Sequence, residues 1–168
     1  MAALGGVRAR SAIPVRAPFA TVAPMAIERM DHVSIVVEDL PAAIEFFKAL
    51  GLELGNEGSV EGSEVDRIVG LKEVRSDLAF VRTPDGNSQI ELVKFNSPPL
   101  QAGDREAPAN TPGLRHLCFA VDDLDSTLAS VQAKGAELVG EVVAYGNSYR
   151  LCYVRGPEGV IIELAEKL

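Results

Sequence analysis

The chain contains two histidines, His32 and His116, and each stands near the start of a short run of apolar residues. Two glutamates, Glu91 and Glu163, lie inside later apolar runs, one in each half of the chain. Imidazole nitrogen and carboxylate oxygen together suit borderline divalent metals such as Zn, Ni, Co, Fe and Mn. If the first and last strands of each half are neighbours, each half contributes one nitrogen and one oxygen. We therefore predict one divalent metal ion per site, bound by these four residues, with positions open for water and substrate.

Each of these residues alone has a simpler interpretation. A lone histidine at a strand start is more often a hydrogen-bonded structural residue. The alternation of apolar and polar residues around Glu91 is typical of a strand with one solvated face. Glu163 stands in a more apolar run, where an unpaired carboxylate is costly, so it needs a partner. The joint pattern favours the metal site, because both histidines and both strand glutamates obey one internal symmetry.

That symmetry is an internal duplication of the sequence. Residues 31–40 return as residues 115–124 after a shift of 84 positions, which superposes the histidines and an Asp-Leu pair seven residues further on. Residues 78–86 return as residues 151–159 after a shift of 73 positions, so that a Pro-Asp-Gly turn matches a Pro-Glu-Gly turn. The two halves are therefore two copies of one structural unit.

Hydrophobic periodicity predicts the same order of elements, β-α-β-β-β, in both copies. Asp39 caps a helix that Gly51 ends, and Asp123 caps a helix that Gly135 ends. We expect strands over residues 32–37, 52–57, 76–83, 88–95, 114–121, 136–143 and 160–164, with one more beginning at Leu151.

The elements group into two modules with a linker. Residues 30–95 form the first module, the proline-rich residues 96–113 the linker, and residues 114–168 the second module, all within one domain. Each module has a sheet whose apolar face is too large to leave exposed, so pairing the modules is the economical way to bury it. We predict an α+β fold in which two tandem βαβββ modules form a curved, barrel-like mixed sheet with helices outside.

Composition restricts the partners of the chain. Hydrophobic residues make up 47% and charged residues 24% of the 168 residues, as in soluble globular proteins. The net charge of −8 disfavours binding to nucleic acid, and no apolar run is long enough to cross a membrane. Cys118 and Cys152 stand singly in apolar runs and are expected to be buried free thiols, which favours a reducing compartment and a cytoplasmic location.

The first 29 residues differ from the rest, because they are rich in Ala, Arg, Pro and Val and hold no acidic residue before Glu28. Residues 1–29 are interpreted as a disordered leader or an overlong start. An organelle transit peptide is the alternative, and it would change the location.

These features resemble the vicinal oxygen chelate superfamily, which includes glyoxalase I, methylmalonyl-CoA epimerase, extradiol dioxygenases and the fosfomycin and bleomycin resistance proteins. The resemblance covers residues 30–168 and rests on the paired βαβββ modules, the His-strand-Asp-Leu-helix openings and the turns before each glutamate strand. Bacterial glyoxalase I is similar in having two histidines and two glutamates, whereas dioxygenases and fosfomycin-resistance enzymes use one glutamate. The resemblance therefore implies the glyoxalase and epimerase branch, although the epimerase typically has glutamine where Glu91 stands.

Two positions depart from bacterial glyoxalase I. Its arginine four residues after the first histidine, which holds the glutathione carboxylate, is Val36 here. Its asparagine four residues after the first glutamate is Phe95, with Asn96 one position further on. These departures weaken the expectation of a glutathione substrate and leave open another thiol adduct, a CoA thioester or an unrelated carbonyl acid.

The chemistry that follows is proton transfer on a small-molecule carbonyl substrate. A divalent metal that chelates two neighbouring oxygens stabilises the enolate or enediolate that forms when a proton leaves the adjacent carbon. Glu163 is the expected base because its strand is the more apolar, and Glu91 is the second ligand or the acid that returns the proton. Tyr149 and Arg150 either bind an anionic group of the substrate or simply form a hairpin loop. We predict a glyoxalase-like lyase or isomerase.

Two other functions would use the same fold. One is a non-catalytic protein of the bleomycin-resistance type that binds or sequesters a small molecule, and the other is a metal-dependent dioxygenase. A homodimer is expected, because each module leaves a sheet edge to be covered. The length of the linker permits the modules to pair within one chain or to swap between two.

Overall fold

The computed structural model describes residues 27–168, and Asp31–Leu168 form one compact unit. The leader predicted over residues 1–29 therefore lies almost wholly outside the described residues. Within residues 27–168, no helix is long and apolar enough to cross a bilayer.

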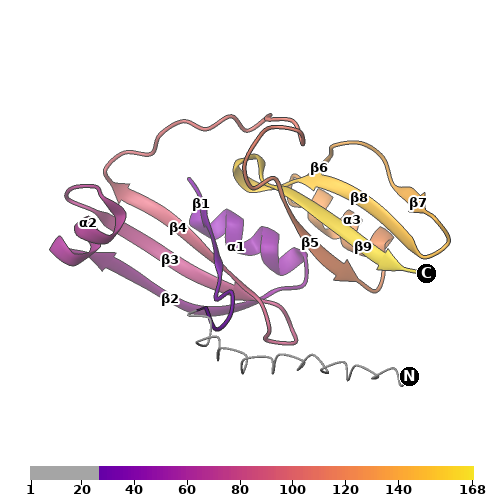
Figure 1. Cartoon of the computed structure of the whole chain (residues 1–168), viewed down its shortest axis with the longest axis horizontal. Helices are drawn as coiled ribbons and strands as arrows, with labels where there is room; N and C mark the ends of the chain where they lie inside the picture. The colour runs from indigo at the N-terminus through magenta and orange to yellow at the C-terminus, as the bar shows by residue number, and fades with distance from the viewer. Residues whose placement is uncertain (1–26) are drawn as a thin grey trace, which may run out of the picture. The chain divides into compact units, whose positions relative to one another are not determined.

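The first module forms a four-stranded sheet in the order β1-β4-β3-β2, with β1 at its outer edge (Figure 1). β1 runs parallel to β4, and the other neighbours are antiparallel. β2 continues beyond the strand expected over residues 52–57, and a short second helix, α2, follows it. The elements are β1 (Val33–Val36), α1 (Leu40–Ala49), β2 (Glu53–Glu61), α2 (Ser63–Val69), β3 (Arg75–Arg82) and β4 (Gln89–Ser97).

The second module repeats this plan in the order β5-β9-β8-β6, again with the histidine strand at the edge. The single strand expected over residues 136–143 is wrong: two short strands, β6 and β7, both pair with β8. They are separated by a bend at Gly140, a residue type that weakens strands. The elements are β5 (His116–Val121), α3 (Leu124–Gln132), β6 (Glu137–Leu138), β7 (Val143–Tyr145), β8 (Tyr149–Arg155), the 3₁₀ turn η1 (Pro157–Gly159) and β9 (Ile161–Lys167).

The predicted helix caps are present in both modules. The Asp39 carboxylate accepts a hydrogen bond from the Ala42 backbone N–H at 2.9 Å, and Asp123 accepts one from Ser126 at the same distance. These bonds satisfy amide groups that the first turn of a helix leaves without partners. His32 directly precedes the strand before α1 and His116 opens the strand before α3, so each capped helix follows the strand next to a histidine.

One hydrophobic core includes residues of both modules. α1 contributes Phe47 and α3 contributes Leu124, which lie with Leu92 of β4 and Leu164 of β9 in a single cluster, all four fully buried. Burial of such a side chain stabilises the fold by roughly 1.5–3 kcal/mol. The α+β prediction is confirmed, but the strands form two separate sheets that do not close into one barrel-like sheet.

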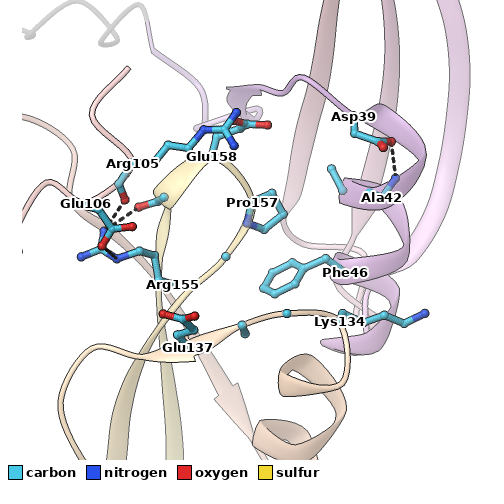
Figure 2. Close-up of a pocket in the computed structure, with 15 residues that line it drawn as sticks. Asp39, Ala42, Phe46, Arg105, Glu106, Lys134, Glu137, Arg155, Pro157 and Glu158 are labelled. Carbon is cyan, nitrogen blue, oxygen red and sulfur yellow. Dashed lines mark hydrogen bonds and ion pairs between the residues drawn. The ribbon is translucent and has the colours of Figure 1, made fainter. Parts of the chain in front are cut away.

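The linker is tied to both modules by charged groups, and Figure 2 shows the contacts of Arg105 with Glu158 and Arg155 of the second module. Arg105 Nη2 lies 2.6 Å from Glu38 Oε2, just after β1, and 2.5 Å from Glu158 Oε2 in the turn before β9. Arg155 donates from Nη1 to the backbone carbonyl of Arg105 at 3.0 Å. The backbones of Gly159 and Arg105 also lie in contact, since a Cβ placed on Gly159 would overlap the Arg105 carbonyl group. The linker therefore holds the two modules in one arrangement.

Candidate metal centre

In the first module the structure brings His32 and Glu91 together. His32 immediately precedes β1, and Glu91 lies on the neighbouring β4. The His32 Nε2 atom is 3.6 Å from Glu91 Oε2, and its Nδ1 atom is 3.1 Å from Asp31 Oδ2. The tautomer that donates Nδ1–H to Asp31 leaves a lone pair on Nε2, directed at a carboxylate. Two electron-rich atoms that face each other in this way suit a cation between them.

In the second module the structure brings His116 and Glu163 together in the same manner. His116 opens β5, Glu163 lies on the neighbouring β9, and Nε2 approaches Oε2 to 3.1 Å. The Glu163 side chain is 17% exposed and that of Glu91 is 20% exposed, so both carboxylates are mostly shielded from water. Each module thus presents one imidazole nitrogen beside one carboxylate oxygen.

The strand register shows what surrounds each carboxylate. Directly paired residues on adjacent strands point to the same face of a sheet. Glu91 is paired with Ser34 on β1 and with Phe80 on β3. Each histidine lies two residues before the β1 or β5 member of its row, so it shares that face.

The same row in the second module contains different side chains. Glu163 is paired with Cys118 on β5 and with Tyr153 on β8. The Tyr153 ring centroid lies 5.1 Å from that of His116, tilted by 35°. The Phe80 ring lies 5.7 Å from that of His32 and nearly perpendicular to it, at 83°.

The charge of Glu163 affects both of its neighbours. Partial burial of the thiol raises the pKa of Cys118, and the Glu163 charge and a hydrogen bond to that carboxylate raise it further. Burial also raises the pKa of Tyr153, with additional contributions from Glu163 and Cys118. Both groups therefore keep their protons at neutral pH. The prediction of two buried thiols is wrong for Cys118, which is exposed on the open face of its edge strand, while Cys152 is buried and both are free.

The structure keeps the two His–Glu pairs apart. Within the described part of the chain, no three His, Cys, Asp or Glu side chains lie close enough together to hold a metal ion. β1 and β5 face a common cavity of about 300 Å³, which His116 lines with β1 residues, but the two strands are not hydrogen-bonded to each other. The four side chains are of the kind that bind a divalent metal, since they comprise two imidazoles and two carboxylates. Each module supplies two of the four predicted metal ligands.

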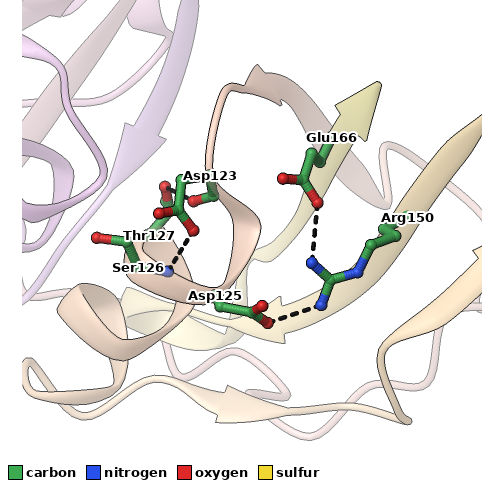
Figure 3. Close-up of polar contacts among 6 residues, drawn as sticks. All are labelled: Asp123, Asp125, Ser126, Thr127, Arg150 and Glu166. Carbon is green, nitrogen blue, oxygen red and sulfur yellow. Dashed lines mark hydrogen bonds and ion pairs between the residues drawn. The ribbon is translucent and has the colours of Figure 1, made fainter. Parts of the chain in front are cut away.

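The two predicted substrate-binding residues lie apart from these pairs. Arg150 Nη2 lies 2.8 Å from Asp125 Oδ1 of α3, and Nη1 lies 3.0 Å from Glu166 Oε2 of β9 (Figure 3). Glu166 is three residues from Glu163, so strand alternation directs it to the opposite face of the sheet. Tyr149 begins β8 and is 41% exposed. In this structure Arg150 therefore ties a helix to a strand.

Three residues of the centre were not found from the sequence: Asp31, Cys118 and Tyr153. The repeat contained a signal for two of them. The shift of 84 positions places Cys118 on Ser34, and the shift of 73 places Tyr153 on Phe80. A comparison of the two copies position by position would have marked these substitutions beside the glutamates.

The chain matches known proteins over most of its length. Residues 31–153 match the family described as the glyoxalase/bleomycin resistance protein/dioxygenase superfamily. Protein YwbC of Bacillus subtilis, which is uncharacterised, is 29% identical over 143 residues that cover 83% of this chain and 98% of the relative. Human mitochondrial methylmalonyl-CoA epimerase is 26% identical over 148 residues that cover 82% of this chain and 73% of the epimerase.

A solved structure agrees with the fold described above. A glyoxalase family protein from Bacillus cereus is 49% identical, and the match covers 88% of this chain and 99% of that protein with a TM-score of 0.83. The likeness therefore includes both modules and their arrangement in one chain.

Proposed function

Because the chain belongs to the glyoxalase/bleomycin resistance protein/dioxygenase superfamily, we propose that it is a metal-dependent lyase or isomerase that transfers a proton next to a carbonyl group. The observation that carries the proposal is the pair of matching His–Glu contacts, at 3.6 Å in the first module and 3.1 Å in the second. The same contact recurs at equivalent places of the two sheets, which supports a common role for the four residues. Relatives named as methylmalonyl-CoA epimerases, from human and Cereibacter sphaeroides, support this branch of the superfamily.

The residues that would hold the metal are His32, Glu91, His116 and Glu163, and Zn, Ni, Co, Fe and Mn all suit this donor set. Such an ion, when bound, supplies Lewis-acid stabilisation of negative charge on substrate oxygens. Asp31 accepts the Nδ1–H of His32 and so fixes the ring with Nε2 toward the centre.

The protein groups carry the proton. A carboxylate of Glu163 or Glu91 takes a proton from the carbon next to the carbonyl, and the other carboxylate returns one to the opposite face or to the neighbouring carbon. We assign the base to Glu163 because it lies in the more apolar strand. A small carbonyl compound with a second oxygen donor is the substrate class that fits.

A second copy of the chain would bring the four donors together. The shared core and the linker contacts of Arg105 hold the modules of one chain in an arrangement that keeps the pairs apart. β1 and β5 are each the outer strand of a sheet, and no other strand within residues 27–168 covers their free edges. Two copies that pair reciprocally, β1 of one with β5 of the other, would form two equivalent centres around a twofold axis.

The test combines metal analysis with an isotope assay. Protein purified without chelators is reconstituted with each metal and incubated with α-oxo-aldehyde thiol adducts and 2-substituted acyl-CoA esters that carry deuterium next to the carbonyl. We expect stoichiometric metal and loss of the label. We expect neither in His116→Ala, whereas both persist in a control, Glu53→Gln, changed at an exposed strand carboxylate of the first module. Absence of metal, together with unchanged ligand binding in His116→Ala, would instead indicate a sequestering protein.

A further inference from the structure

The two halves of the candidate metal centre have the same backbone plan but differ at one aromatic position. Phe80 stands beside Glu91 on the third strand of the first module, and Tyr153 stands beside Glu163 at the equivalent place of the second. Each ring also contacts the histidine of its own module. The only chemical difference between the two aromatic side chains is the Tyr153 hydroxyl.

That hydroxyl is a donor without an acceptor. Among the described residues, no hydrogen bond of the Tyr153 hydroxyl exists, while the Glu163 carboxylate already interacts with Cys118 on its other side. The ring is partly buried and is placed by its contact with His116, so the hydroxyl is held at the open face of the sheet. A tyrosine in such a position normally finds a polar partner when a ligand covers it.

We propose that the Tyr153 hydroxyl donates a hydrogen bond to the substrate oxygen that becomes negatively charged during proton transfer. The inference rests on the proposed function and extends it by assigning the carbonyl oxygen to the second module. In this step the C–H proton passes to Glu163, the C–H electron pair moves toward the carbonyl carbon, and the carbonyl oxygen gains the charge. Tyr153 keeps its proton throughout and contributes only the hydrogen bond, which strengthens as the charge develops.

The first module has no equivalent donor at this place. The Phe80 ring lies nearly perpendicular to that of His32 and has no polar atom that could bind a ligand. A substrate with two unequal oxygens therefore gains from binding in one orientation, with the oxygen that becomes charged beside Tyr153. The duplication would otherwise allow two orientations related by the pseudo-twofold axis.

The experiment compares Tyr153→Phe, which makes the second half match the first, with the reciprocal Phe80→Tyr and with Tyr145→Phe, an exposed control on β7. Three quantities are measured for each: metal content, the rate of deuterium loss, and the affinity of the metal-loaded protein for acetohydroxamate. Acetohydroxamate is the probe because it is an anion with two neighbouring oxygens, like the intermediate.

We expect Tyr153→Phe to retain full metal and an unchanged KM, to lose deuterium roughly 100-fold more slowly, and to bind acetohydroxamate roughly tenfold more weakly. Tyr145→Phe should behave as wild type, and Phe80→Tyr should not rescue Tyr153→Phe. Equal kcat and equal acetohydroxamate binding in Tyr153→Phe, with metal present, would overturn this inference alone. A wild-type protein that binds neither metal nor acetohydroxamate would overturn the proposed function as well.

Discussion

The two halves of the candidate metal centre are built on the same strands and differ in what surrounds the ligands. In the first half, the Asp31 carboxylate accepts a hydrogen bond from the His32 ring. In the second half, the equivalent position is Arg115, which turns away and donates to the Ala107 carbonyl at 3.1 Å. Beside its glutamate, the second half has the hydroxyl of Tyr153 where the first half has Phe80, and the thiol of Cys118 where the first half has the hydroxyl of Ser34.

This difference indicates that the two halves of the duplicated site have different roles. A carboxylate behind a metal-binding histidine orients the ring and raises its basicity, which favours tight binding of the ion. A hydrogen-bond donor beside a glutamate that acts as base stabilises the negative charge that develops on the substrate. We therefore expect the first half to dominate metal affinity and the second half to dominate the rate.

The largest effect is expected when each histidine is removed in turn. His32→Ala and His116→Ala should each lose bound metal and deuterium exchange almost completely, because each change removes one ligand from every centre. If two copies complete the centre, mixing the two variants after mild unfolding creates hybrids with one intact centre. Up to about half of the activity should then return in each hybrid dimer. No recovery in a verified hybrid would mean that the ligands meet within one chain.

The next effect concerns the two glutamates. Glu163→Gln should slow deuterium exchange by roughly 10³-fold, because the expected base is lost. Glu91→Gln should slow it less and should mainly weaken metal binding, since the amide oxygen is a poorer ligand than a carboxylate. Rates at saturating metal separate the two effects. Equal rate losses in both variants would show that the halves share the chemistry equally.

A third prediction compares the two matching turns. Gly86 and Gly159 both have positive φ, +71° and +78°, but a Cβ would meet nothing within 4 Å at Gly86 and the Arg105 carbonyl at Gly159. Gly86→Ala should lower the free energy of unfolding by about 1 kcal/mol through backbone strain. Gly159→Ala should cost roughly 2 kcal/mol more, because the linker must move. Urea unfolding of both variants measures the difference, and equal losses would mean that the linker contact is not fixed.

The smallest effect is expected for Arg150→Ala. The nearby Arg150 lowers the pKa of Asp125 from its ordinary value of 3.8, mainly through a hydrogen bond. Since the folded-state pKa is the lower one, this stabilisation is present above pH 3.8 and disappears as the pH falls through the folded value. Arg150→Ala should therefore be slightly less stable than wild type at neutral pH, and the difference should shrink in acid. Deuterium exchange should stay unchanged. A raised KM for the substrate would restore the substrate-binding role predicted from the sequence.

The sequence predicted the parts of the fold that depend on local patterns. The caps at Asp39 and Asp123 and the histidine strands follow from residues close together in the chain. The bend at Gly140 was missed because the repeat suggested an unbroken strand. The two His–Glu contacts followed from the repeat, because neighbouring first and last strands bring each pair together.

Other parts depend on how the modules pack, which the repeat does not encode. Phe47 of α1 and Leu124 of α3 meet in one core, and that packing decides the distance between the two pairs. Tyr153 was missed for a different reason. The proposed role of the Tyr153 hydroxyl follows from the comparison with Phe80. That comparison requires knowing that both rings contact the histidine of their own module, which only the structure shows.

The outer position of β1 and β5 also matters for a single copy of the chain. An open strand edge offers unpaired backbone groups to any extended chain nearby and is a common starting point for aggregation. β1, with four residues, is a short template, but β5 has six and an exposed face. If two copies pair through β1 and β5 as proposed, the pairing also covers both of these edges. Self-association would then serve solubility as much as chemistry.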